Sequence, residues 1–249
     1  MIRRGWQLTS SRAQWHSDSL TLAFDWAQPE FGLGLTHASL PTACTPRLFG
    51  LILPVRQESE DPSRLPLFAC GNLLSATYDA AESFPVQINV AWRVGAPSPH
   101  SSLMIVDAVF SISTEKLNAQ GRFAIRSVLP AVEVLTAAGP LDTACWKTWT
   151  PAPEDPPCAT ESPAVLFRLP GETFSYLEIA DPVDSRCCRL SGQGPATVGL
   201  DRGLFATTLE KGVILRARVR GVLLDQAEDV RSAGAAYADF VGSAPPLGR

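Results

Sequence analysis

Residues Gly203–Leu224 read GLFATTLEKGVILRARVRGVLL, and apolar side chains recur there at every second position. Successive side chains of a β-strand face opposite sides of the sheet, so this spacing predicts strands with one apolar face. A glycine-containing turn signal at 210–212 divides the stretch, which predicts a β-hairpin. On its second arm Arg216, Arg218 and Arg220 share the face opposite the apolar one. We therefore expect three guanidinium groups in a row on one side of a sheet.

The same alternation recurs along most of the chain, in about a dozen short stretches such as Leu20–Trp26, Phe84–Val94 and Leu103–Ser113. Turn residues separate these stretches at the intervals typical of a sandwich, and no long amphipathic helices alternate with them. One alanine-rich segment, about 225–241, repeats its apolar residues at helical spacing. The sequence therefore predicts an all-β fold, a large antiparallel two-sheet sandwich (supersandwich-like) with a short C-terminal helix.

The length of 249 residues suits one undivided β-sandwich domain over residues 1–249. The segment 150–163 holds five prolines, a density that excludes a central strand or a helix. We expect it to form a surface loop of that domain. The alternative is a linker between two subdomains.

The composition bounds the partners and the compartment of the protein. A formal net charge of −4, from 21 Lys and Arg against 25 Asp and Glu, gives no general attraction to nucleic acid. No apolar run is long enough for a membrane span, and no secretory signal is visible after Met1, so we expect a cytoplasmic protein that binds no membrane. The six cysteines lack a Cys-x-x-Cys spacing, which predicts reduced thiols and no metal site. No phosphate-loop or dinucleotide motif occurs, so no cofactor is expected.

Two parts of the sequence resemble segments of uncharacterised β-rich bacterial proteins with no assigned activity. These are Leu67–Asp79, continuing through Phe84–Trp92, and Leu209–Val222. The resemblance implies a single-domain unit and no catalytic residue. The number and length of the strands also resemble the two-sheet sandwiches of sugar-processing enzymes, an analogy of fold that carries no function.

Candidate catalytic groups are few. No histidine stands near a nucleophile and an orienting partner, and no nucleophile-elbow motif occurs. Glycoside cleavage needs two carboxylates about 5–10 Å apart. Asp107, on the strand face shared by Leu103, Ile105 and Val109, and Glu178, in the strand that begins near Phe174, are candidates for that chemistry. The alternative is that they are ordinary side chains of a sheet.

The arginine row is the stronger candidate site. Arg216, Arg218 and Arg220 follow one another at about 6.5–7 Å, which suits a carboxylated or polyhydroxylated ligand along the strand. It also suits an ordinary outer sheet face that pairs with acidic neighbours. Trp146 and Trp149 would form a stacking pair for sugar rings if both were exposed, although a spacing of three places them on opposite faces of a strand.

The first hypothesis is therefore a non-catalytic binding or interaction module for a carbohydrate or an acidic small ligand. The second hypothesis is a carbohydrate-active enzyme that uses carboxylates of a sheet face. The third is a structural subunit that adds the strand starting at Val213 to the sheet of a partner.

Overall fold

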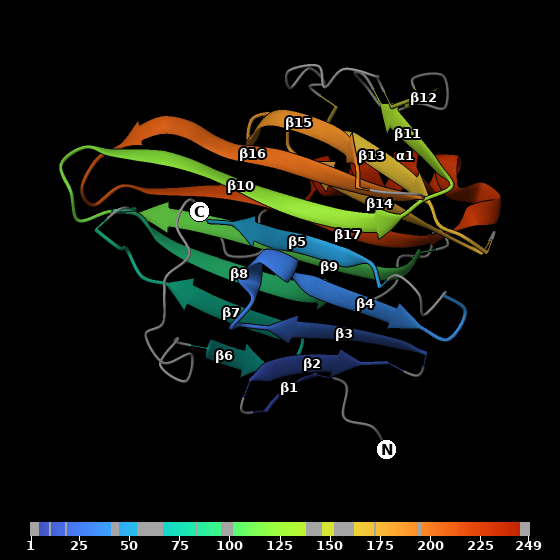
Figure 1. Ribbon diagram of the computed structural model, residues 1–249, viewed down its shortest axis with the longest axis horizontal. Helices are drawn as coiled ribbons and strands as arrows, with labels where there is room; N and C mark the ends of the chain where they lie inside the picture. Colours follow the sequence, from blue (N-terminus) through green and yellow to red (C-terminus); the bar gives the residue numbers. More distant parts are fainter. Residues whose placement is uncertain are drawn as a thin grey trace.

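The structure is a computed structural model, and it describes residues 5–9, 11–17, 19–40, 45–53, 67–82, 84–95, 102–137, 146–151, 162–171, 173–193 and 196–244. These residues form two large antiparallel sheets that lie face to face, with one α-helix towards the C-terminal end (Figure 1). The predicted fold class, a two-sheet sandwich with a short C-terminal helix, is confirmed.

In the described part of the chain, sheet A has eight strands. In spatial order they are β1 (Trp6–Leu8), β2 (Arg12–His16), β3 (Leu20–Asp25), β4 (Leu33–His37), β5 (Arg47–Ile52), β10 (Ala119–Pro130), β16 (Thr197–Leu209) and β15 (Ser185–Gly192). A turn of 3-10 helix, η1 (Pro29–Phe31), connects β3 to β4.

Sheet B has nine strands among the residues that the structure describes. In spatial order they are β12 (Trp146–Thr148), β11 (Glu133–Ala137), β13 (Ala164–Arg168), β14 (Phe174–Ala180), β17 (Ile214–Asp225), β9 (Ser102–Ser113), β8 (Gln87–Gly95), β7 (Leu73–Tyr78) and β6 (Leu67–Cys70). A 3-10 turn, η4 (Gln226–Glu228), then leads into the helix α1 (Asp229–Gly242), which accounts for the helix predicted at 225–241.

The predicted hairpin of β16 and β17 is wrong, because the two strands belong to different sheets. β16 pairs with β10 and β15, whereas β17 pairs with β9 and β14. The apolar faces of both strands contribute to one core, with Leu204 and Leu209 from β16 and Ala217, Val219 and Leu223 from β17. The chain thus crosses from one sheet to the other at the turn, and the apolar faces of the two strands meet across the core between the sheets.

This topology also disfavours the hypothesis that the strand starting at Val213 pairs with the sheet of a partner, because its part from Val219 to Leu224 already has a strand on both sides. β9 lies beside β17 from Ile214 to Leu224, and β14 lies on its other side from Val219 to Asp225. The edge strands of the two sheets are β1 and β15 in sheet A, and β12 and β6 in sheet B.

Two of these edges meet. The backbone N–H of Trp6 in β1 donates to the carbonyl of Gly71, directly after β6, at 2.8 Å. The indole N–H groups of Trp6 and Trp15 donate to the backbone and side-chain oxygens of Asn72, at 3.1 and 3.3 Å. Sheets A and B are therefore joined by hydrogen bonds along one side of the sandwich.

Helix α1 covers part of the outer face of sheet B. The outward side chains of β11, β13, β14 and β17 are apolar there and form a second cluster with Ala233 and Phe240 of the helix. At the start of α1, the carboxylate of Asp229 accepts hydrogen bonds from Arg168 at 2.9 and 3.2 Å and from Ser175 at 2.8 Å. We call this covered area the helix half of sheet B. The outer face of β9, β8, β7 and β6 is the polar half.

Most of the proline-rich segment 150–163 lies outside the described residues. No helix in the described part of the chain has both the length and the apolar character needed to cross a membrane.

Candidate binding surface

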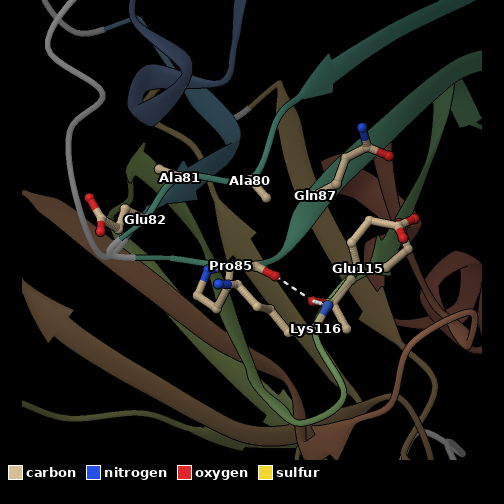
Figure 2. A pocket seen from close by; sticks show the side chains of 9 residues that line it. Ala80, Ala81, Glu82, Pro85, Gln87, Glu115 and Lys116 are labelled. Carbon is tan, nitrogen blue, oxygen red and sulfur yellow. Dashed lines mark hydrogen bonds between the residues drawn. The ribbon is translucent and has the colours of Figure 1, made fainter.

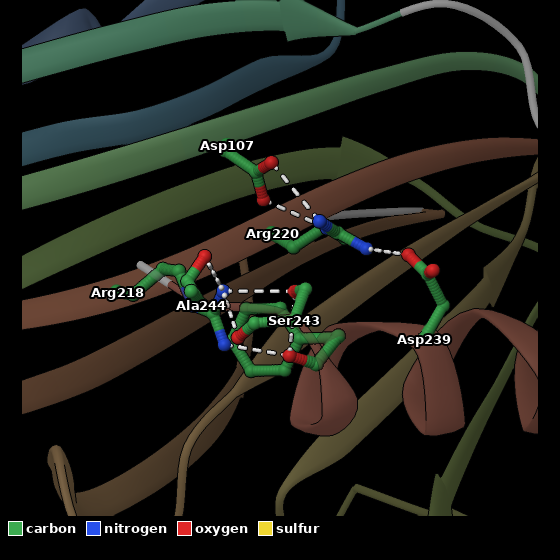
Figure 3. Close-up of polar contacts among 7 residues, drawn as sticks. Asp107, Arg218, Arg220, Asp239, Ser243 and Ala244 are labelled. Carbon is green, nitrogen blue, oxygen red and sulfur yellow. Dashed lines mark hydrogen bonds and ion pairs between the residues drawn. The ribbon is translucent and has the colours of Figure 1, made fainter. Parts of the chain in front are cut away.

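The arginine row faces outward from sheet B, as the alternation predicts, at the boundary between the helix half and the polar half. Arg218 holds the C-terminal end of α1 (Figure 3). Its guanidinium donates to the carbonyl of Phe240 at 2.6 Å and to the hydroxyl of Ser243 at 3.0 Å, and its Cζ lies 4.0 Å from the centre of the Phe240 ring. Helix C-terminal carbonyls favour a cation, so this contact stabilises the docked helix. Burial lowers the pKa of Arg218 below the usual value of a guanidinium.

Arg220 is held by two carboxylates. It donates to both oxygens of Asp107 on the neighbouring β9, at 2.7 and 3.0 Å, and to Asp239 of α1 at 2.6 Å (Figure 3). Arg216, the third arginine, is exposed and lies opposite Ser111. The structure thus brings the arginine row together with α1, and two of its three members contact the end of the helix.

The two candidate carboxylates lie on opposite faces of sheet B. Asp107 faces outward beside Arg220, whereas Glu178 of β14 faces the interior of the sandwich. Glu178 accepts hydrogen bonds from Arg202 of β16 at 2.9 Å and from Ser127 of β10 at 2.5 Å. Asp107 and Glu178 therefore cannot converge on one sugar.

Glu178 and Arg202 form an ion pair between the two sheets, and both side chains are fully buried. Burial raises the pKa of Glu178, while Arg202 and the hydrogen bond from Ser127 lower it, and the net direction is upward. Arg202 also donates to the backbone carbonyls of Ser162 and Glu178, at 3.1 and 3.2 Å. The charged groups of Glu178 and Arg202 are thus both satisfied by partners inside the sandwich.

Trp146 and Trp149 do not share a surface. Trp146 packs against the cluster beneath α1, and Trp149 packs against the core between the sheets. The pair therefore provides no common stacking platform.

The residues that sequence reasoning missed lie on the polar half. Six uncharged polar side chains face outward from three adjacent strands: Ser75 and Thr77 on β7, Gln87 and Asn89 on β8, and Ser111 and Ser113 on β9. We call these six residues the polar face. Their inward neighbours are apolar core residues, so the alternation along each strand could have identified their orientation. Only the pairing of the strands places them side by side.

Register and hydrogen bonds organise the polar face. Asn89 lies opposite Thr77 on one side and opposite Ser111 on the other. Its amide nitrogen donates to the hydroxyls of Thr77 at 2.8 Å and Ser75 at 3.3 Å. These bonds fix the amide, so its oxygen and the neighbouring hydroxyls keep a defined arrangement.

The polar face has a different neighbour on each side. Phe68 of β6 lies opposite Ser75, and its side chain is 57% exposed, which makes its ring accessible to a ligand. On the other side Arg216 lies opposite Ser111. A row of hydroxyl and amide groups is thus bordered by an aromatic ring and by a guanidinium group.

A pocket of about 390 Å³ adjoins the polar face at the ends of β8 and β9. Gln87 and Ser113 belong to both the pocket and the polar face, and the charged lining residues are Glu82, Glu115 and Lys116. Figure 2 shows Ala80 and Ala81 on one wall and Glu115 and Lys116 on the other.

Two hydrogen bonds brace the pocket. The hydroxyl of Thr114 donates to the carbonyl of Pro85 at 2.5 Å and accepts from the backbone N–H of Lys116 at 3.1 Å, which ties the β7–β8 connection to the β9–β10 connection. Glu115 pairs with Lys211 of the β16–β17 turn at 3.0 Å. The walls of the pocket are therefore linked to each other and to a third connection.

No group of three or more His, Cys, Asp or Glu side chains among the described residues is arranged to hold a metal ion.

The sequence matches no protein-family model and no curated protein. Solved structures share its fold at low identity. An aldose 1-epimerase-like protein from Escherichia coli K12 is 8% identical with a TM-score of 0.57, over 85% of this chain and 98% of that one. The Slr1438 protein from Synechocystis sp. PCC 6803 is 12% identical with a TM-score of 0.52, over 88% of this chain and 99% of that one.

A third structure is much longer than this chain. The α-N-acetylgalactosaminidase NagBb from Bifidobacterium bifidum is 12% identical with a TM-score of 0.56, and the match covers 92% of this chain but only 39% of the enzyme. At these identities the likeness shows a shared β-sandwich fold.

Proposed function

We propose that the protein is a non-catalytic module that binds carbohydrate on the polar face and in the adjoining pocket. The observation that carries the proposal is the row of six uncharged hydroxyl and amide side chains in register on three adjacent strands. Hydroxyl and amide groups both donate and accept hydrogen bonds, as the hydroxyls of a sugar do. This recognition of a sugar needs no charged side chain on the protein.

Two neighbouring features support a sugar rather than another polar ligand. The exposed ring of Phe68 borders the polar face, and an aromatic ring packs well against the C–H groups of a sugar ring. The fold is shared with an aldose 1-epimerase-like protein and with an α-N-acetylgalactosaminidase, both named for sugar chemistry. This fold likeness supports the proposed ligand class by analogy.

The arginine row supports an acidic small ligand less well than the polar face supports a sugar. Arg218 donates to the end of α1, and Arg220 donates to Asp107 and Asp239. An anionic ligand would have to replace these hydrogen bonds, which costs part of the binding free energy it would gain.

One observation favours a carbohydrate-active enzyme as the second candidate function. Glu82 and Glu115 come from different connections and line the same pocket. Enzymatic activity would appear as cleavage of a glycoside or as interconversion of sugar anomers. Nuclear magnetic resonance detects both reactions. If the wild type performs such a reaction, and if Glu82→Gln and Glu115→Gln each abolish it, the protein is an enzyme and the proposal of a non-catalytic module is wrong.

The binding proposal is tested by a thermal-shift screen against neutral sugars, followed by titration calorimetry. A ligand of the native state raises the melting temperature by mass action. Asn89→Ala removes the amide at the centre of the polar face, and we expect the affinity to fall about 2- to 10-fold, as for the loss of one hydrogen-bonding group.

Gln120→Ala on the outer face of sheet A is the matched control. Like Asn89→Ala, it removes a side-chain amide that donates to a hydroxyl on the neighbouring strand. Here the Gln120 amide nitrogen lies 3.5 Å from the Thr208 hydroxyl, and we expect sugar binding to be unchanged. Absence of any shift with sugars, or equal affinity of Asn89→Ala and the wild type, would refute the proposed function.

A further inference from the structure

The pocket and the polar face form one continuous surface. Gln87 and Ser113 lie opposite each other at the ends of β8 and β9, and both line the pocket. Two residues further along the same strands, Asn89 and Ser111 form the next outward pair. A ligand seated in the pocket therefore reaches the hydroxyl and amide groups of the polar face without crossing another element of sheet B.

This surface is longer than one sugar ring. Ala91 lies four residues after Gln87 on β8. Ala91 is opposite Ser75 of β7, and Ser75 is opposite Phe68 of β6, so Phe68 lies two strands away from Ala91. With about 3.4 Å per residue and about 4.8 Å between strands, the backbone positions of Gln87 and Phe68 are roughly 17 Å apart. A single monosaccharide cannot contact both ends.

The two ends also differ in chemistry. The pocket adds Glu82, Glu115 and Lys116 to the shared polar residues, and its volume of about 390 Å³ lies within the range of small-molecule pockets. The Phe68 end offers an exposed ring beside Ser75. Between them Asn89 is held by hydrogen bonds to Ser75 and Thr77.

We propose that the ligand is an oligosaccharide, with one unit in the pocket and the following units across the polar face as far as Phe68. This inference rests on the proposed function and adds the length and the direction of the ligand. Each unit contributes its own hydrogen bonds, so the affinity should rise with chain length until the Phe68 end is reached.

The test is a calorimetric titration with glucose-, galactose- and N-acetylglucosamine-based saccharides of one to four units. For the sugar that binds, we expect the dissociation constant to fall at least tenfold from the monosaccharide to the tri- or tetrasaccharide. Lys116→Ala in the pocket and Phe68→Ala at the far end should each raise the dissociation constant of the longest saccharide at least threefold.

Both substitutions lie on the surface, so folding should be unaffected, and the melting temperature checks this. Phe31→Ala, an exposed phenylalanine of η1 on the sheet A side, is the control for Phe68→Ala and should leave all affinities unchanged. Equal affinity for one unit and for four units, with Asn89→Ala still weakening both, would overturn the oligosaccharide proposal and leave the carbohydrate function intact. Failure of every saccharide to bind would overturn both.

Discussion

The helix half and the polar half of sheet B are built from one sheet but have opposite outer surfaces. On the helix half the outward side chains are apolar: Leu166, Leu177, Ile179, Val222 and Leu224 lie beneath α1. On the polar half the outward residues of β7, β8 and β9 include Ser75, Thr77, Gln87, Asn89, Ser111 and Ser113. The inward side chains of both halves are mostly apolar core residues, and Glu178 of β14 is an inward exception.

The difference teaches that the outward residues of a sheet decide where a helix docks. Burying apolar surface drives docking, and a hydroxyl-rich face offers little such gain. The arginine row lies at the boundary and serves the helix: Arg218 contacts the carbonyl end of α1 and Arg220 contacts Asp239. The polar half is the part of sheet B whose side chains are suited to a polar ligand.

The largest expected effect comes from the buried ion pair between Arg202 of sheet A and Glu178 on the inner face of the helix half of sheet B. Arg202→Met leaves the Glu178 carboxylate without its buried cation, and we expect the free energy of unfolding to fall by about 3–5 kcal/mol. Urea denaturation measures this loss. Arg93→Met, at an exposed position of the polar half, should change stability by no more than about 0.5 kcal/mol.

A double variant distinguishes the loss of a partner from a general defect of packing. Arg202→Met combined with Glu178→Leu removes both charges and should recover much of the stability, because neither charge is then buried alone. If the double variant were as unstable as the sum of the two single variants, the ion pair would not be the cause.

The second effect tests the boundary. Arg218→Ala removes charged hydrogen bonds to Phe240 and Ser243, and we expect it to lower the free energy of unfolding by about 1.5–3 kcal/mol. Hydrogen exchange of the amides of α1 should increase at the same time, because the helix is less firmly docked. An unchanged melting temperature and unchanged exchange would show that the row does not hold the helix.

The sequence predicted the faces of the strands but not their partners. The alternation in β17 correctly placed Ala217 and Val219 inside and Arg218 outside, because the period of two is a local property. It could not show that β16 and β17 separate into different sheets, since this depends on which surfaces meet in the core.

The candidate site was missed for a related reason. Asn89 and Ser111 are 22 positions apart in the sequence and become neighbours only through the register of β8 and β9. The regular spacing of three charges identified Arg218 as a candidate ligand-binding residue. Its contact with Ser243, however, depends on how α1 packs back along the sheet. Regular spacing within a strand was visible in the sequence, and contacts between elements were not.

The smallest predicted effect is a pH-dependent change in stability. It comes from Asp229, at the N-terminal end of α1. Burial on its own would raise the pKa of Asp229, but the hydrogen bonds from Arg168 and Ser175 outweigh it, and the net pKa is lowered from 3.8. A carboxyl group with a lowered pKa in the folded state stabilises the protein above its unfolded pKa and loses that contribution as the pH falls through the folded value.

We expect Asp229→Asn to cost about 1 kcal/mol at neutral pH, and the difference from the wild type should shrink as the pH falls below 3.8. Denaturation curves between pH 7 and about pH 2 measure it. Asp79→Asn, at an exposed position of the β7–β8 connection, is the control. A difference that stayed constant over this range would mean that the charge of Asp229 has no part in holding α1.

The junction at Trp6, Gly71 and Asn72 bears on self-association. An unpaired strand edge can recruit a strand of another molecule, which is a common start of aggregation. Here β1 begins and β6 ends at the same junction, where the backbone of Trp6 is bonded to Gly71 and two indoles are bonded to Asn72. We therefore expect intermolecular strand addition more readily at β15 and β12, the other edge strands in the described part of the chain, than at this junction.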